Sequence, residues 1–382
     1  MIPYGRQDIS EADIAAVTEV LRSDFLTQGP AVPRFEEALA ARVGAAHGVA
    51  VNSATSALHV AVAALGLGPG DLLWTSPVTF VASANCARYC GADVDFVEID
   101  PGTFNMSADA LEAKLARASA EGRLPKVIVP VHMAGQSPDA ARIAELARAH
   151  GVRIVEDASH AIGASYRGAP VGDCAHSDIT VFSFHPVKII TTAEGGLATT
   201  QDPALADRMA LLRSHGITRD PAAMTGESDG AWYYQQIELG WNYRMTEMQA
   251  ALGLSQLSRL DAFVDRRRAL ADRYDALLAD LPLRRPERLE DAESAWHLYV
   301  VQLDDAARHR AVFDALREAG IGVNLHYIPV HTQPYYRALG FSDGDFSVAE
   351  DYYSRAISIP LHARLTEDEQ DRVVAALAEA LA

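Results

Sequence analysis

The sequence lacks three features that would each indicate a particular class of protein. Its three cysteines, Cys86, Cys90 and Cys174, are an odd number and lack the paired spacing of a zinc site. No apolar run approaches the roughly 18 residues of a membrane-spanning helix. The N-terminal residues MIPYGRQDIS lack the basic and apolar segments of a secretory signal. We therefore expect reduced thiols, no metal site, no membrane association and a cytoplasmic protein.

Positive charge is also scarce. The 382 residues include 33 Lys and Arg against 51 Asp and Glu, a formal net charge of −18. Such a charge disfavours binding to nucleic acid or to an anionic membrane. An anionic substrate would therefore need a local group of basic residues. At this length, with 49% hydrophobic residues, the chain is long enough for two domains.

Between about residues 49 and 200, short apolar runs alternate with segments of helical periodicity. The runs are GVAVNS, DLLWTSP, DVDFVEID, KVIVPVHMAG, VRIVEDASH, DITVFSFH and GGLATT. Strands that are apolar on both faces and are joined by helices predict an α/β fold, with a mainly parallel sheet covered on both sides. In such sheets ligands bind beyond the carboxyl ends of the strands.

A second, smaller domain is expected after a long loop. Residues 219–236, RDPAAMTGESDGAWYYQQ, are rich in Gly, Pro and acidic residues, which is typical of a loop. From MTEMQ to LLADL, leucines recur at spacings of three and four and predict one long amphipathic helix. We predict a large domain over residues 1–245, and a connecting helix with a smaller C-terminal α/β domain over residues 246–382.

Four features near the predicted strand ends have the chemistry of a pyridoxal phosphate (PLP) site. Lys188 follows DITVFSFH and offers an amine, and Asp157 ends VRIVEDASH and offers a carboxylate for the pyridine nitrogen. NSATSALH is a strand-to-helix turn whose amides can bind a phosphate. Phe80, at another such junction, offers a ring to stack on. Each feature alone has an ordinary structural explanation, as a surface lysine, a helix cap or a core aromatic. Their combination carries the hypothesis.

Several motifs, spread almost from end to end, resemble the DegT/StrS family of PLP-dependent sugar-nucleotide aminotransferases. This resemblance implies the fold-type I aminotransferase architecture. The matching stretches are DFLTQGPAVPRFEEALA, VNSATSALHVA, GPGDLLWTSPVTFVASAN, VPVHMAGQ, VEDASHAIGA, FSFHPVKIITTAEGGLATT, RSHGI, NYRMTEMQAALGLSQL and HYIPVHTQPYY.

The resemblance implies roles for the residues around the cofactor ring. Lys188 takes the place of the lysine that binds the cofactor covalently, and Asp157 that of the partner of the pyridine nitrogen. His160 would lie near the phenolic oxygen, and Phe80 would stack on the ring. Some relatives carry His at the lysine position and are dehydratases, so Lys188 favours transamination.

The resemblance also implies contacts to the cofactor phosphate. Ser183 in FSFHPVK and the helix-start residues Ala54 and Thr55 would bind it within one chain. Asn242 in GWNYRMTE would reach the phosphate of the neighbouring subunit. A site shared in this way implies a homodimer.

Within the family, the stretches KIITTAEGG, RSHGI, GLSQL and HYIPVH look closest to the 4-aminotransferase of pseudaminic acid biosynthesis. The expected substrates are therefore L-glutamate and a UDP-linked 4-keto-6-deoxy-N-acetylhexosamine. Loop 219–236 and the segment from His326 and Tyr327 to Tyr336 are candidates for sugar or nucleotide contacts. The candidate cations for the diphosphate are Arg213, His215, Arg219 and Arg244.

Other interpretations stay open at this point. Any of these cations could instead form a structural salt bridge. The acceptor could be the precursor of another amino sugar, such as perosamine or 4-amino-4-deoxy-L-arabinose. The chain could also act on amino acids alone, or be a regulatory protein that keeps the fold without catalysis.

Overall fold

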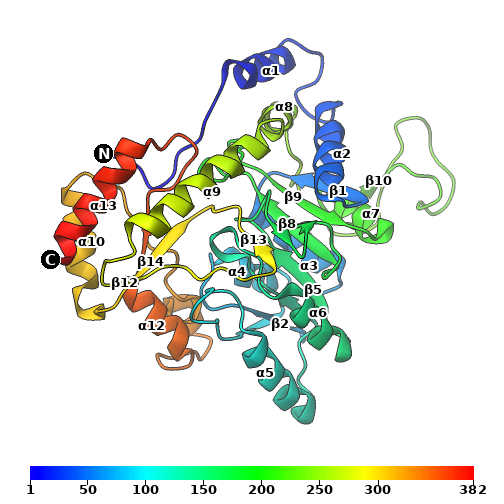
Figure 1. Cartoon of the computed structure of the whole chain (residues 1–382). Coiled ribbons are helices and arrows are strands. Elements are labelled where there is room, and N and C mark those ends of the chain that lie inside the picture. Colours follow the sequence, from blue (N-terminus) through cyan, green and yellow to red (C-terminus); the bar gives the residue numbers. More distant parts are fainter.

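Seven strands form the central sheet of the computed structural model, which describes residues 1–382 (Figure 1). Their order is β1-β9-β8-β5-β4-β2-β3, and only β9 runs antiparallel to its neighbours. The loop between β8 and β9 contains no crossover helix, so the chain returns antiparallel. The mainly parallel sheet is confirmed. The strands are β1 His47–Val51, β2 Leu72–Thr75, β3 Asp93–Phe96, β4 Val127–Val129, β5 Arg153–Asp157, β8 Ile179–Ser183 and β9 Gly196–Thr200.

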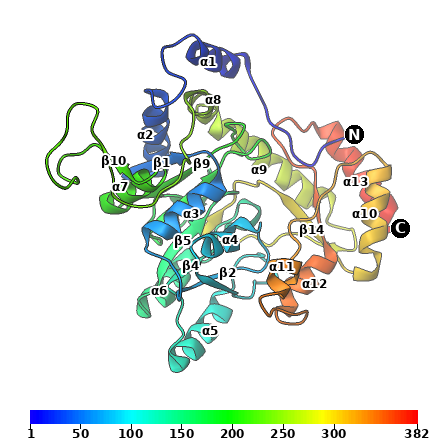
Figure 2. The same ribbon diagram turned by 180° about the vertical axis from the view of Figure 1, so that it is seen from behind.

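Helices cover both faces of this sheet, which explains why its strands are apolar throughout. Along β8, Val181 packs into the core under α3, α4 and α7, whereas the next residue, Phe182, packs on the opposite face. Figure 2 shows α3 and α4 in front of the sheet. The helices of this unit are α2 Ala31–Val43, α3 Ala54–Ala64, α4 Ala82–Tyr89, α5 Ala108–Glu121, α6 Ala140–Ala149, α7 Pro203–Leu212 and α8 Glu247–Leu257, with the 3-10 turn Met133–Gly135.

A second α/β unit follows, with a sheet of order β12-β14-β15 and a core of its own. Both chain termini lie at this unit (Figures 1 and 2). Ile2 pairs with Ile321 and is buried in the second core. The division at residues 245 and 246 stays a prediction. The elements are α9 Leu260–Leu277, β12 Leu283–Arg284, β14 Tyr299–Leu303, α10 His309–Glu318, α11 Pro334–Arg337, α12 Ser347–Arg355, β15 Ala356–Ile359 and α13 Glu367–Leu381, with the 3-10 turns Ala306–Arg308 and Val330–Thr332.

The prediction of one long helix after residue 245 is wrong, because α8 ends at Leu257 and α9 begins at Leu260. At the break, the Ser258 hydroxyl donates to the Ser255 carbonyl at 2.6 Å, a contact that bends helices. The next residue, Arg259, donates from Nη2 to Asp13 Oδ2 at 2.7 Å. Asp13 belongs to α1 (Glu11–Leu21), which lies on α8, so the break is fixed by a contact remote in sequence.

The loop predicted over residues 219–236 is present, and a two-residue ladder closes it. Strands β10 (Ile217–Thr218) and β11 (Gln235–Gln236) pair at its base. The loop projects away from both units in Figures 1 and 2. A further small sheet joins β13 (Ala292–Glu293) to β6 (Ser165–Tyr166) and β7 (Ala169–Pro170).

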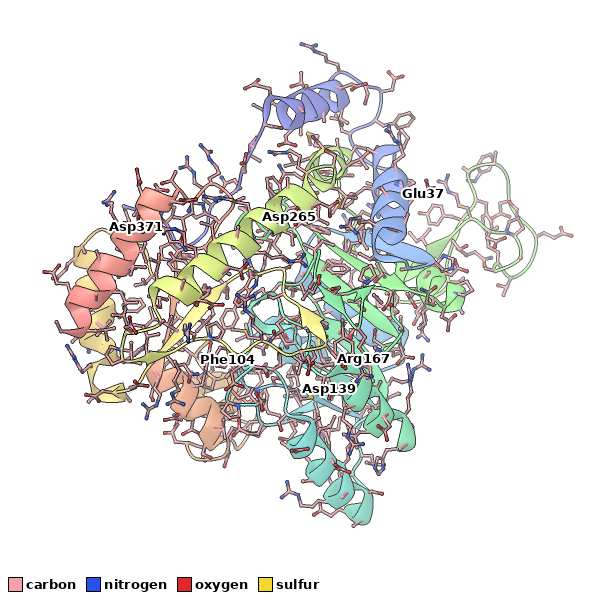
Figure 3. All side chains as sticks on the ribbon, viewed as in Figure 1. Glu37, Phe104, Asp139, Arg167, Asp265 and Asp371 are labelled. Atoms are coloured by element: carbon pink, nitrogen blue, oxygen red, sulfur yellow. The ribbon has the colours of Figure 1, made fainter.

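The charged side chains lie mainly on the outside of the molecule. Glu37, Asp265 and Asp371 point outward from α2, α9 and α13, whereas Phe104 is buried (Figure 3). No helix is both long enough and apolar enough to cross a bilayer.

Candidate active site

A cavity of about 600 Å³ opens where β5 and β8 end and α3 begins. This is the edge of the sheet at which the sequence predicts ligand binding. Both units contribute to its wall. The sequence-predicted residues that line it are Ala54, Thr55, Phe80, Asp157, His160, Ser183, Lys188, His326 and Tyr327.

Lys188 enters this cavity from the loop between β8 and β9. Burial lowers the pKa of its amine to about 8, and the negative charge of Asp157 offsets only part of that effect. Its ammonium group forms no ion pair within 4.0 Å with a carboxylate. Lys188 is therefore a basic group whose neutral, nucleophilic form is accessible near neutral pH.

Asp157 is fixed at the end of β5 by three hydrogen-bond donors. The Ser83 hydroxyl donates to Oδ2 at 2.6 Å. Ser159 donates to Oδ1 twice, from its backbone nitrogen at 3.1 Å and from its hydroxyl at 2.5 Å. The carboxyl group is buried, and each of its two oxygens accepts at least one hydrogen bond. Sequence reasoning missed Ser83 and Ser159, although both stand in motifs it had singled out.

His160 is a buried, neutral histidine at the cavity wall. Its Nε2 lies 3.1 Å from the Tyr327 hydroxyl, and its ring stands 4.4 Å from that of His297. Burial first, and then the positive charge of Lys188, hold its pKa well below 6.5. The other ring nitrogen, Nδ1, is buried without any hydrogen-bond partner. This nitrogen is therefore free to form a hydrogen bond with a bound ligand.

The start of α3 supplies amide donors to the same cavity. Ser53 caps the helix by accepting from the Ser56 backbone nitrogen at 3.1 Å. The amides of Ala54 and Thr55, in the first turn, have no partner within the helix. Strand β9 begins directly against this turn, because a Cβ on Gly196 would lie 2.6 Å from the Ala54 nitrogen. The arrangement can bind a phosphate through backbone amides.

Phe80 forms an exposed aromatic wall. The residue is 57% accessible, so the explanation of Phe80 as a core residue is excluded. Its ring centroid lies 6.1 Å from that of Tyr327, which also lines the cavity. An aromatic face left open to a cavity can stack on a flat ligand.

Together these groups fit PLP. They offer a reactive amine, a carboxylate, an amide cradle for a phosphate, an open aromatic face and an unpaired histidine nitrogen. No cluster of three or more His, Cys, Asp or Glu side chains is arranged to hold a metal ion.

Comparison with known proteins identifies the family. The pattern of the DegT/DnrJ/EryC1/StrS aminotransferase family matches residues 7–378. The chain belongs to this family. The spore coat polysaccharide biosynthesis protein SpsC of Bacillus subtilis is 40% identical, over 98% of this chain and 96% of that protein. The UDP-4-amino-4,6-dideoxy-N-acetyl-beta-L-altrosamine transaminase of Campylobacter jejuni is 37% identical, over 96% and 93%.

Solved structures support the assignment of the chain to this family. Spr1654 from Streptococcus pneumoniae in its PLP form superimposes with a TM-score of 0.89 at 31% identity, covering 99% of this chain and 98% of that one. Its PMP form gives a TM-score of 0.90 at 32% identity, covering 100% and 99%. The sequence-based prediction of a PLP-dependent sugar aminotransferase with the fold-type I architecture is confirmed.

Several predicted substrate contacts do not line the cavity of this aminotransferase. Arg213 pairs with Glu36 and donates to the Ala50 carbonyl at 2.7 Å, which is the structural role considered as its alternative. The other candidate cations outside the lining are His215, Arg219 and Arg244. Asn242 also lies outside it, and its predicted contact with the cofactor phosphate of the neighbouring subunit stays a prediction.

The second unit contributes residues that the sequence indicated only in part. His326, predicted from HYIPVH, lines the cavity with Nδ1 2.8 Å from the Ser358 hydroxyl, and burial lowers its pKa to about 3. Tyr4, His297 and Asn324 also line it. No motif marked these three, because they reach the cavity only through the packing of the second unit and the N-terminal segment.

Proposed function

We propose that this aminotransferase moves the amino group of L-glutamate to C4 of a UDP-linked 4-keto-6-deoxy-N-acetylhexosamine, as in pseudaminic acid biosynthesis. The observation that carries the proposal is Lys188, an amine with a lowered pKa in the same cavity as the buried carboxylate of Asp157. The named 4-transaminase of Campylobacter jejuni, 37% identical over nearly the whole chain, supports the choice of sugar.

When bound, PLP supplies the electron sink that an amino-group transfer requires. Lys188 would hold it and, with a pKa about 8, could take up or release a proton near neutral pH while the amino group moves. Asp157 would present a negative charge to the ring nitrogen. Phe80 and the amides of Ala54 and Thr55 would hold the ring face and the phosphate.

The two substrates would use the same cavity in turn. L-Glutamate would bind first, give up its amino group and leave as 2-oxoglutarate. The sugar ketone would then enter and accept the amine. The order requires room for two different carbon skeletons, and the cavity of about 600 Å³ has the size of a typical small-molecule site.

A cytoplasmic homodimer with shared sites belongs to the same proposal. The cavity wall includes no arginine, although the proposed sugar carries a diphosphate. Asn242 is exposed outside the wall, and loop 219–234, which projects away from both units (Figure 1), contains Trp232, 73% accessible. These groups, with Arg219, would complete the cavity of the partner subunit.

A different nucleotide sugar is the second candidate. SpsC, at 40% identity, has a higher identity than the altrosamine transaminase, and its name refers to spore coat polysaccharide. A precursor of perosamine or of 4-amino-4-deoxy-L-arabinose would need the same chemistry at C4. Action on amino acids alone, or a regulatory role, fits the family and the reactive Lys188 less well.

The test is a panel of UDP- and dTDP-linked 4-keto sugars incubated with the PLP-loaded protein and L-glutamate, with each product identified by NMR. We expect amination at C4 and fastest turnover with the UDP-linked N-acetylated sugar. Faster turnover of a sugar without the N-acetyl group would overturn the substrate assignment. The PLP-loaded Lys188→Ala variant is the control, because it measures any amino-group transfer that does not require the catalytic lysine.

A further inference from the structure

A chain of two buried hydroxyl groups ends on Asp157. Thr79 Oγ1 lies 2.7 Å from Ser83 Oγ, and Ser83 Oγ lies 2.6 Å from Asp157 Oδ2. Both hydroxyl residues are buried, with Ser83 completely inaccessible. A carboxylate only accepts hydrogen bonds, so the Ser83 hydrogen points to Asp157 and the Thr79 hydrogen points to Ser83. The charge of Asp157 therefore sets the direction of both hydrogen bonds.

The same short segment carries the aromatic wall of the cavity. Phe80 stands between the two hydroxyl residues, and Ser83 lies in the first turn of α4. The Ser83 contact therefore ties Phe80 to the position of Asp157, which comes from β5 across the sheet. On the other side, Ser159 donates to Oδ1. With donors on both oxygens, the carboxylate has few directions left in which to accept another hydrogen bond.

We propose that Thr79 and Ser83 are positioning residues. They orient the Asp157 carboxylate toward the ring nitrogen of the cofactor and fix the position of Phe80 relative to Asp157. The inference rests on the cofactor role proposed for Asp157. It does not depend on which sugar accepts the amine.

Asp157 has one cation and several neutral groups around it. Lys188, from the loop after β8, is the cation that faces Asp157. Cys86 of α4 and Tyr327 of the second unit also face Asp157. Burial, together with the negative charge of Asp157, raises the pKa of both side chains, so both stay neutral. Neutral His160 completes the surroundings. Loss of the Ser83 donor would leave Oδ2 of Asp157 without its hydrogen bond, so the carboxylate would no longer be held in one orientation.

The experiment measures the single-turnover half-reaction of the PLP-loaded protein with L-glutamate across pH, together with the absorbance of the bound cofactor. Ser83→Ala should slow the half-reaction about 10-fold or more, which corresponds to one hydrogen bond to a charged group, and should change the absorbance of the bound cofactor, because the charged partner of the ring nitrogen is displaced. Thr79→Val, which keeps the side-chain shape, should act in the same direction with a smaller effect. Thr79→Ser, which keeps the hydroxyl, should restore the wild-type profile.

Thr75→Val is the matched control. Thr75 is equally buried, on β2, and its hydroxyl donates to the Val129 carbonyl at 2.8 Å and not to a carboxylate. We expect Thr75→Val to lose thermal stability while its half-reaction rate and the absorbance of its bound cofactor stay at wild-type values.

Two results would overturn the inference. One is a wild-type rate and a wild-type cofactor absorbance in both Thr79→Val and PLP-loaded Ser83→Ala. The other is an equal loss in the Thr75→Val control. A wild-type protein that gives no half-reaction would instead refute the proposed function, and this inference with it. If Ser83→Ala fails to fold, the comparison of Thr79→Val with Thr79→Ser still decides.

Discussion

The lowered pKa of Lys188 predicts how fast the apoprotein captures PLP at each pH. Only the neutral amine attacks the cofactor aldehyde. With the pKa at about 8 instead of 10.5, about 9% of the amine is neutral at pH 7, against about 0.03% for an ordinary lysine. The reactive fraction is therefore about 300-fold larger. Because the pKa of a cation is lowered, this advantage is fully present below pH 8, declines as the pH rises from 8 to 10.5 and is lost above 10.5.

The assay mixes apoprotein with PLP in a stopped-flow instrument and follows the absorbance of the lysine-bound cofactor between pH 6 and pH 11. The expected rate rises with pH to an inflection near 8 and then levels off. A small lysine analogue mixed with the same cofactor is the control, since it shares every titration of PLP itself, and its rate should rise to above pH 10. A protein rate that follows the analogue up to pH 10 would refute the reasoning.

Three further variants test other parts of the site. Asp157→Ala should slow the half-reaction with L-glutamate about 100-fold or more, measured in a single turnover, because the ring nitrogen loses its charged partner. Gly196→Ala should weaken PLP retention in dialysis, because its Cβ would lie 2.6 Å from the Ala54 nitrogen and displace the start of α3. In the apoprotein, Lys188→Met should raise the free energy of unfolding at pH 7 by up to about 3 kcal/mol, because the folded state holds this lysine at a lowered pKa. Urea unfolding should show that this gain declines as the pH rises from 8 to 10.5.

Each of these expectations has a contrary result. A wild-type half-reaction rate in loaded Asp157→Ala would remove Asp157 from the mechanism. Full PLP retention in Gly196→Ala would mean that the start of α3 does not hold the phosphate. A stability difference for Lys188→Met that stayed constant from pH 7 to pH 11 would show that packing, and not charge burial, sets the stability of the apoprotein.

The sequence predicted the central sheet well because its signals are local. Each of the seven strands begins within, or next to, an apolar run that is hydrophobic on both faces. Lys188, Asp157 and Ser183 could be placed in one cavity because strand ends of a mainly parallel sheet share an edge.

The features that escaped prediction depend on contacts between distant parts of the chain. The break between α8 and α9 is fixed by Arg259 and Asp13, which lie 246 residues apart. His297 and Tyr4 reach the cavity from the second unit and the N-terminal segment. Arg213 has no local pattern that would reveal Glu36 as its partner. Such contacts follow from the way the two units pack, which periodicity does not encode.

The most direct test of the central claim follows isotope-labelled nitrogen from L-glutamate into the amino sugar. The assay compares the wild-type protein with Lys188→Ala, each loaded with PLP and given the UDP-linked 4-keto sugar. The wild-type protein should place the label on C4, and the variant should transfer none. Transfer by Lys188→Ala at the wild-type rate would contradict the account.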